Sequence, residues 1–167
     1  MSDHTPQFGL LHQQRFGPFF ATQFLGAAND NLFKFALTVL VTYQLQVSWL
    51  PASVAGLVIG ALFITPFVLL SATAGQLADR MDKAVLMRRV KDCEIAIMAL
   101  AVLGFVMQWP ALLMVCLVAM GVHSTFFGPA KFAYLPQVLK PSELTGGNGM
   151  VEMGTFVAIL LGNTVGG

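Results

Sequence analysis

The sequence has few charged residues: only 10% of its 167 residues are Asp, Glu, Lys or Arg. A soluble domain usually carries about 25% charged residues, because its solvated surface needs them. Hydrophobic residues make up 56% of the chain and include 14 Phe. This composition excludes a disordered chain and an ordinary soluble enzyme, and it indicates that a lipid bilayer is the solvent.

The sequence also lacks an excess of either charge and a cluster of metal-binding residues. The net charge of +1 excludes a basic nucleic-acid binder, so no nucleic acid is expected as a partner. The two cysteines, Cys93 and Cys116, have neither metal-ligand spacing nor a disulfide framework, and we expect both to be small buried hydrophobic residues. No cofactor is expected, and no cleavable signal peptide is evident because the first 15 residues are polar.

Motifs of membrane enzymes are missing as well. None of the three histidines has an aspartate five positions later, as the His-x4-Asp acyltransferase signature requires, and there is no Gly-x-Ser-x-Gly. Gly147-Asn148-Gly149 lacks the third glycine of a dinucleotide fingerprint and follows no expected strand. We therefore expect no enzymatic activity in this segment, although an enzyme fused downstream would not be visible in it.

Long apolar runs are what the sequence does contain. A helix that spans a bilayer needs about 20 mostly apolar residues, and the runs here do not alternate with the period of two that is typical of strands. The sequence therefore predicts an all-α, polytopic membrane protein with about five transmembrane helices. These are expected at residues 18–45, 53–78, 92–108, 111–134 and 147–167.

Basic residues are concentrated at alternate connections between these expected helices. Eight of the nine Lys and Arg lie in the N-terminal segment or in the connections after the second and fourth helices, and the exception is Lys34. Since basic loops stay in the cytoplasm, we expect residues 1–16 to form a cytoplasmic N-terminal segment ahead of the membrane part, residues 17–167. Trp49 and Trp109 then lie in outer turns, where amphipathic rings favour the interface.

The first expected helix carries a polar face. Gln23, Asp30, Asn31, Lys34 and Thr38 fall within an arc of about 100° on a helical wheel. A charge at the middle of a bilayer costs about 2.5–3.5 kcal/mol on insertion scales, so a helix that faces lipid would not carry two. This face looks into protein or water, either as an Asp30–Lys34 ion pair that holds helices together or as a substrate or coupling-ion site.

The fifth expected helix repeats this pattern. Asn148, Glu152, Thr155 and Asn163 lie within about 80° of one another, and Glu152 is the charged residue of the segment. Because Glu152 is near the cytoplasmic end of this helix, it belongs either to the same polar site or to the membrane interface.

The fourth expected helix adds a cation. Ser124 and Lys131 are seven residues apart and share a face, although Lys131 is close enough to the helix end to snorkel. His123 precedes them, and a single histidine in an apolar helix is more often a hydrogen-bonded structural residue than a proton carrier. Three helices thus offer charges of both signs to a shared polar cavity, which suits a zwitterionic or anionic substrate.

The connection after the second helix has a distinctive order, Gly75-Gln76-Leu77-Ala78-Asp79-Arg80-Met81-Asp82-Lys83. We expect Gly75 to allow close helix approach, and Asp79, Arg80 and Lys83 to form a charge network that breaks when helices move. The alternative is an ordinary basic cytoplasmic loop, which does not explain the order of the residues.

Small and kinking residues also recur within the apolar runs. Small residues four positions apart predict close helix contacts in lipid, and Pro66 and Pro129 predict kinks or local breaks. The small pairs are Gly56/Gly60, Ser71/Gly75 and Gly162/Gly166.

The segment that begins Gly75-x-Leu-Ala-Asp-Arg-x-x-Lys resembles the signature loop of the major facilitator superfamily, with Asp82 in place of its second glycine. Within that superfamily, three further stretches look like the lysophospholipid transporter family. They are Gln23-Phe24-Leu25-Gly26-Ala27-Ala28-Asn29-Asp30-Asn31, Gly128-Pro129-Ala130-Lys131-Phe132, and Asn148-Gly149-Met150-Val151-Glu152 with its continuation to Gly162.

The resemblance implies a carrier of the bacterial inner membrane that moves lysophospholipids to the inner leaflet for re-acylation, in some relatives fused to acyltransferase and ligase domains. It implies that Asp30, Lys131 and Glu152 contact the headgroup or a coupling ion, and that Gly75, Asp79 and Arg80 belong to a gating loop. The superfamily has twelve helices in two halves. The chain is therefore expected to be a partial sequence that works with the carrier's remaining helices.

Two other functions fit the same residues. The loop motif suits a superfamily carrier for a drug, a sugar or another small metabolite equally well. The chain also fits a structural membrane subunit that transports nothing, in which case neutralising Asp30 would leave function intact.

Overall fold

The computed structural model describes residues 7–45 and 47–167, and these parts of the chain contain helices and turns without strands. Each apolar run forms one long helix. In chain order the elements are η1 (Gln7–His12), α1 (Gly17–Val39), η2 (Leu40–Gln44), α2 (Ala52–Arg80), α3 (Lys83–Val106), α4 (Pro110–Val138), η3 (Pro141–Glu143) and α5 (Leu144–Gly166). Of these, η1 and η3 are 3-10 turns and η2 is a π-helical turn that prolongs α1.

The all-α membrane fold predicted from the sequence is confirmed. Four segments of the described chain are long and apolar enough to cross a membrane: Gly17–Gln44, Ala52–Arg80, Pro110–Val138 and Pro141–Gly166. The expected third span is a helix too, but α3 begins at Lys83, well before residue 92. Its first three turns are rich in charge, and for this reason it does not reach the same apolar composition.

The turn between α2 and α3 is short because Asp82 caps α3. The Oδ1 atom of Asp82 accepts a hydrogen bond from the backbone N–H of Val85 at 2.9 Å. This bond satisfies one of the free N–H groups at the start of the helix. Asp82, which stands in place of the second glycine of the signature loop, thus caps the start of α3.

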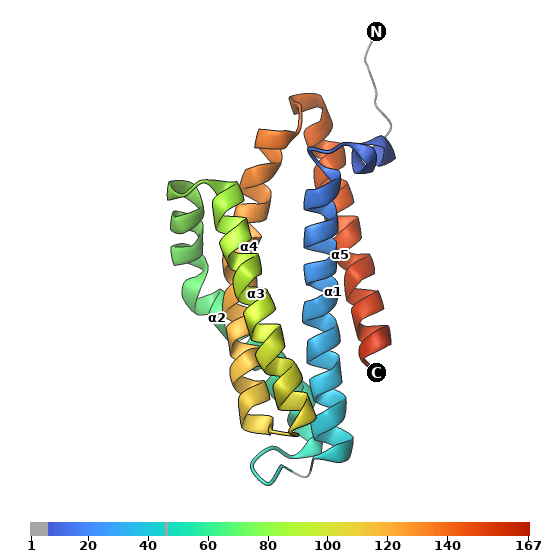
Figure 1. Ribbon diagram of the computed structural model, residues 1–167, viewed down its shortest axis with the longest axis vertical. Helices are drawn as coiled ribbons and strands as arrows, with labels where there is room; N and C mark the ends of the chain where they lie inside the picture. The colour runs from blue at the N-terminus through green and yellow to red at the C-terminus, as the bar shows by residue number, and fades with distance from the viewer. Residues whose placement is uncertain (1–6, 46) are drawn as a thin grey trace.

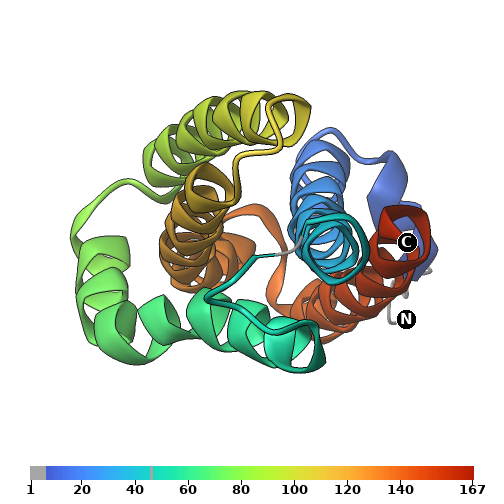
Figure 2. The same ribbon diagram turned by 90° about the horizontal axis from the view of Figure 1, so that it is seen from below.

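The helices pack as two groups. α1 packs most extensively on α5, whereas α2 and α3 both pack on α4. Seen from below in Figure 2, α4 lies between α2 and α3, and α1 lies beside α5. In Figure 1 the start of α1, the α2–α3 turn and the α4–α5 connection all lie at the upper end of the bundle. α2 and α4 continue through Pro66 and Pro129, so neither proline breaks its helix.

Glycines allow the close approach of α5 to α1. A Cβ atom at Gly162 would meet the backbone of Ala28 and Leu32, and one at Gly166 would meet the backbone of Leu32. The prediction for this small pair is therefore confirmed. Gly60 and Gly75, by contrast, have no atom of another element near their Cβ positions within the described chain.

Apolar cores occupy the two ends of the bundle and leave its middle polar. One core joins Phe33, Leu37, Ile59, Leu113 and Leu117 at the lower end. A second core is built on Leu10, Phe16, Leu135, Leu139 and Val151, and a third on Ala78, Leu86, Val90 and Ala130. The polar face of α1 passes between these cores.

The outside of the bundle is apolar as well. Leu57, Val68 and Val106 are each at least 75% exposed, and many other large hydrophobic side chains accompany them. Such a surface is not stable in water, and a bilayer satisfies it. Cys116 is buried as expected, but the prediction for Cys93 is wrong, because this residue is exposed on the outer face of α3.

Arg15 ties the N-terminal segment to the α4–α5 connection. Its guanidinium donates hydrogen bonds to Glu143 Oε1 at 2.7 Å and to the carbonyl oxygen of Val138 at 2.8 Å. Glu143 also accepts a hydrogen bond from the backbone N–H of Lys140. These bonds hold the segment before α1, the end of α4 and the start of α5 together.

The Arg15–Glu143 ion pair predicts a contribution to stability. Glu143→Gln is expected to lower the thermal unfolding midpoint of the intact protein, because it leaves the Arg15 guanidinium without its charged partner. Asp92→Asn, at an exposed carboxylate, is the control. An unchanged midpoint in Glu143→Gln would contradict this prediction.

Candidate functional site

A pocket of about 320 Å³ lies in the polar middle of the bundle and is called the central pocket below. All five helices contribute to its lining, with α1 and α4 supplying most of it. The site residues predicted from the sequence that line it are Gln23, Asp30, Asn31, Lys34 and Lys131. The structure therefore brings five of them together, and Phe63, Phe67 and Phe127 supply aromatic walls.

Asp30 and Lys34 do not pair with each other. Asp30 Oδ2 accepts a hydrogen bond from Ser124 Oγ of α4 at 2.5 Å, and its Oδ1 is buried without a partner among residues 7–45 and 47–167. The Lys34 ammonium lies 4.2 Å from the ring centroid of Phe63 on α2. No Asp30–Lys34 contact within 4.0 Å occurs among the ion pairs of residues 7–45 and 47–167, so the first of the two alternatives, an Asp30–Lys34 ion pair, is wrong. Asp30 contacts α4 and Lys34 contacts α2 instead.

The amide side chains of Gln23 and Asn31 on α1 line the central pocket and form hydrogen bonds there. Gln23 is buried, accepts a hydrogen bond from Thr155 Oγ1 at 3.1 Å, and reaches the carbonyl oxygen of Val151 at 3.4 Å. It thereby joins α1 to α5. Asn31 donates to the carbonyl oxygen of Ala27 within its own helix.

Lys131 meets α5 at the edge of the pocket. Its ammonium lies 4.0 Å from Glu152 Oε1 and 4.7 Å from the ring centroid of Phe132. The Glu152 side chain is 49% exposed and does not line the pocket. Asn148 is exposed and lies outside the pocket as well. Of the predicted residues of α5, Glu152 thus reaches the site only through Lys131.

The predicted gating loop forms no charge network in the described chain. Asp79 and Arg80 are exposed and take part in no ion pair there. The Lys83 ammonium donates instead to the backbone carbonyl of Asp79 at 3.2 Å. Because α3 begins directly after Asp82, the loop is too short for its charges to face one another across two helices.

A second polar cluster, which the sequence did not predict, adjoins the central pocket, and its Lys91 and His123 line that pocket. Glu94 of α3 is buried and contacts three residues: Lys91 at 2.5 Å, Asn29 of α1 at 3.0 Å and His123 of α4 at 3.1 Å. The Lys91 ammonium also lies 4.5 Å from the ring centroid of Phe127. The signal that was available is that Glu94 is the acidic residue where the third apolar run begins.

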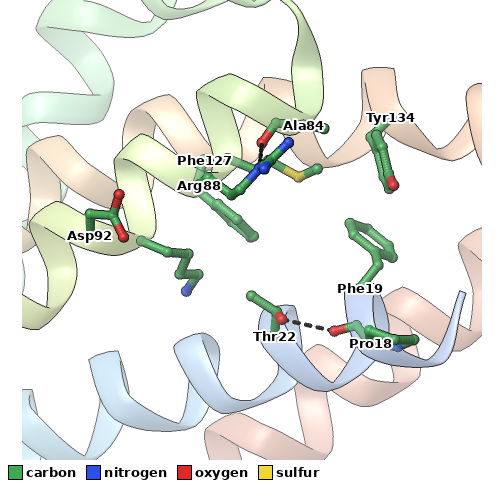
Figure 3. Close-up of a pocket in the computed structure, with 10 residues that line it drawn as sticks. Pro18, Phe19, Thr22, Ala84, Arg88, Asp92, Phe127 and Tyr134 are labelled. Carbon is green, nitrogen blue, oxygen red and sulfur yellow. Dashed lines mark hydrogen bonds between the residues drawn. The ribbon is translucent and has the colours of Figure 1, made fainter. Parts of the chain in front are cut away.

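A larger pocket of about 470 Å³ opens between α1, α3 and α4, toward the upper end of the bundle, and is called the α1–α3 pocket. Figure 3 shows Phe127 and Tyr134 from α4 facing Phe19 and Thr22 from α1, with Arg88 and Asp92 on α3. The hydrogen bonds drawn there, from Thr22 to Pro18 and from Arg88 to Ala84, stay within single helices. Lys91 lines both pockets, so its side chain lies between them.

Residues 19–167 match the Major Facilitator Superfamily. The chain is 30% identical over 145 residues to the lysophospholipid transporter LplT of Serratia proteamaculans. The matched stretch covers 87% of this chain and 34% of that protein. It has the same identity to LplT of Yersinia enterocolitica, where the match covers 33% of the relative. The chain spans about a third of the length of these curated relatives. No solved structure was found to match significantly. The all-helical membrane fold and this match together show that the chain belongs to the major facilitator superfamily.

Proposed function

We propose that this chain forms part of the substrate pathway of a lysophospholipid carrier in the bacterial inner membrane, with its N-terminus in the cytoplasm. The carrier moves lysophospholipids to the inner leaflet, where they are re-acylated. The observation that carries the proposal is the gathering of Asp30, Lys34 and Lys131 around one pocket in the middle of an apolar bundle.

The chemistry of the central pocket fits a zwitterionic headgroup. Lys34 and Lys131 are two ammonium groups for a phosphate, and Asp30 has an unpaired carboxylate oxygen for an amine. Charges in a membrane-spanning segment are costly, and they are retained where they line a pathway. The similarity to proteins named lysophospholipid transporters supports the same substrate class.

The alternating-access mechanism of such carriers fits this arrangement. Substrate sites in these folds lie near the bilayer midplane and open to one side at a time. Here the pocket lies between apolar cores at the two ends of the bundle. Rocking of the helices would open one end and close the other. The remaining helices of the carrier would form the opposite wall.

A flipping assay tests the proposal. The intact protein in vesicles is expected to move a fluorescent lysophosphatidylethanolamine across the bilayer, and Lys131→Ala is expected to slow this movement about tenfold by removing a charge-assisted phosphate contact. Lys140→Ala, at an exposed lysine outside the pocket, is the control. Equal rates for Lys131→Ala and wild type would remove Lys131 from the site. No flipping above that of empty vesicles would contradict the proposed substrate.

A further inference from the structure

One hydroxyl group connects the two polar clusters. Ser124 Oγ donates to Asp30 Oδ2 at 2.5 Å, and it lies 3.4 Å from His123 Nδ1. The His123 side chain is only 3% exposed. Asp30 Oδ1 is buried without a hydrogen-bond partner in the described chain, whereas His123 Nε2 lies 3.1 Å from the Glu94 carboxylate. A buried carboxyl and a buried imidazole thus face each other across a serine.

We propose that Asp30, Ser124 and His123 form a proton-transfer triad in which Asp30 and His123 share one exchangeable proton. In one form His123 is an imidazolium and Asp30 a carboxylate. In the other form His123 is a neutral imidazole and Asp30 a neutral carboxylic acid. The proposal deepens the proposed function, since it concerns the charge of the same pocket.

The transfer is balanced at every atom. His123 gives its Nδ1 proton to Ser124 Oγ while the Ser124 hydroxyl proton passes to Asp30 Oδ2. The N–H bond of the ring and the O–H bond of serine break, and new O–H bonds form on serine and on the carboxyl group. The reverse step restores the first form, so the net charge of the triad does not change.

Charged and polar groups from several helices surround the triad. Glu94 and Lys91 face it from α3, and Asp30 and Asn29 lie on α1. The Glu94 carboxylate lies 3.1 Å from His123 Nε2, and the Lys91 ammonium contacts the same carboxylate. The only charged residues of α2 in the sequence are Asp79 and Arg80, at its far end. Lys34 and Lys131 line the central pocket together with Asp30, and Glu152 of α5 lies 4.0 Å from Lys131.

The triad gives Asp30 a charge that can change inside the membrane. As a carboxylate, Asp30 holds the amine of a headgroup in the central pocket. As a carboxylic acid it loses that attraction, which favours release. The α1–α3 pocket reaches this cluster through Lys91, which lines both pockets, and provides a route for exchange of the proton with water.

Infrared spectroscopy of the intact protein in vesicles tests the triad without any transport assay. Asp30→Asn and His123→Gln identify the carboxyl band and the ring bands by their loss. At one fixed pH, Ser124→Ala is expected to shift the carboxyl band and the ring bands together, because it removes the hydroxyl through which the proton passes. Ser124→Thr, which retains a hydroxyl, is expected to restore both.

His12→Gln, at an exposed histidine, is the control and is expected to leave both bands unchanged. If His123→Gln does not fold, ¹⁵N labelling of histidine assigns the ring bands and Ser124→Ala still carries the test. Carboxyl and ring bands that both stay at their wild-type positions in Ser124→Ala, or a shift of only one of them, would overturn the proposal. Because no substrate is present, this outcome is distinct from a failure to flip lysophospholipid.

Discussion

Replacing Asp30 with asparagine is expected to slow lysophospholipid flipping by the intact protein roughly ten- to hundredfold. A contact to a charged group contributes about 1.5–3 kcal/mol, and each 1.4 kcal/mol corresponds to about a factor of ten. The asparagine side chain still accepts the hydrogen bond from Ser124, so the packing of α1 on α4 is retained. What it removes is the negative charge beside the two lysines of the central pocket.

The measurement is the initial rate of flipping in vesicles, with thermal unfolding of each variant as a check on folding. Asp92→Asn removes a carboxylate of α3 that is exposed and outside the central pocket, and it is expected to flip at the wild-type rate. An unchanged rate in a well-folded Asp30→Asn variant would exclude this carboxylate from the pathway and would favour a structural role for the polar face of α1.

Gly162→Ala is expected to destabilise the protein by about 1–3 kcal/mol, the usual cost of overpacking a close contact. The new methyl group would lie 3.0 Å from the backbone nitrogen of Leu32 and 3.1 Å from Cβ of Asn31. Backbone atoms cannot turn aside as a flexible side chain can, so α5 must move away from α1. Since this is the most extensive interface of α1, the thermal unfolding midpoint is expected to fall by several degrees.

Gly149→Ala provides a matched control on the same helix. No atom of the described chain lies within 4 Å of a Cβ atom at Gly149. Alanine there is expected to stabilise the helix by up to about 1 kcal/mol, because glycine is the poorer helix former. The two substitutions therefore have opposite expected signs. A stabilised Gly162→Ala variant would show that α1 and α5 do not approach as closely as described.

The helices were predictable because most of them are long, mostly apolar runs, and length and hydrophobicity decide where such runs lie. The start of α3 was not, because its first turns carry Arg88, Arg89 and Lys91, which resemble a basic loop in the sequence. Only the Asp82 cap and the packing of Leu86 and Val90 show that the helix begins earlier.

The polar face of α1 was predictable from helical spacing, which decides which residues share a face. Spacing does not decide which helix covers that face. For this reason Asp30 and Lys34 contact Ser124 and Phe63 and do not form the ion pair that was one of the two alternatives, and Asn148 lies outside the pocket. The role of Glu94 was not predicted for the same reason: helical spacing does not show which helices pack together. Its partner Asn29 lies on another helix, 65 positions away in the sequence.

Two consecutive residues of α1 face different helices: Asn29 bonds to Glu94 of α3, and Asp30 bonds to Ser124 of α4. Apolar surfaces tolerate sliding, but hydrogen bonds hold only at one position. These two bonds therefore set the axial register of α1 against the other group of helices. A shift of α1 by one helical turn, about 5.4 Å, would break both at once. Such a shift would have no stable intermediate position, so α1 would move between discrete settings.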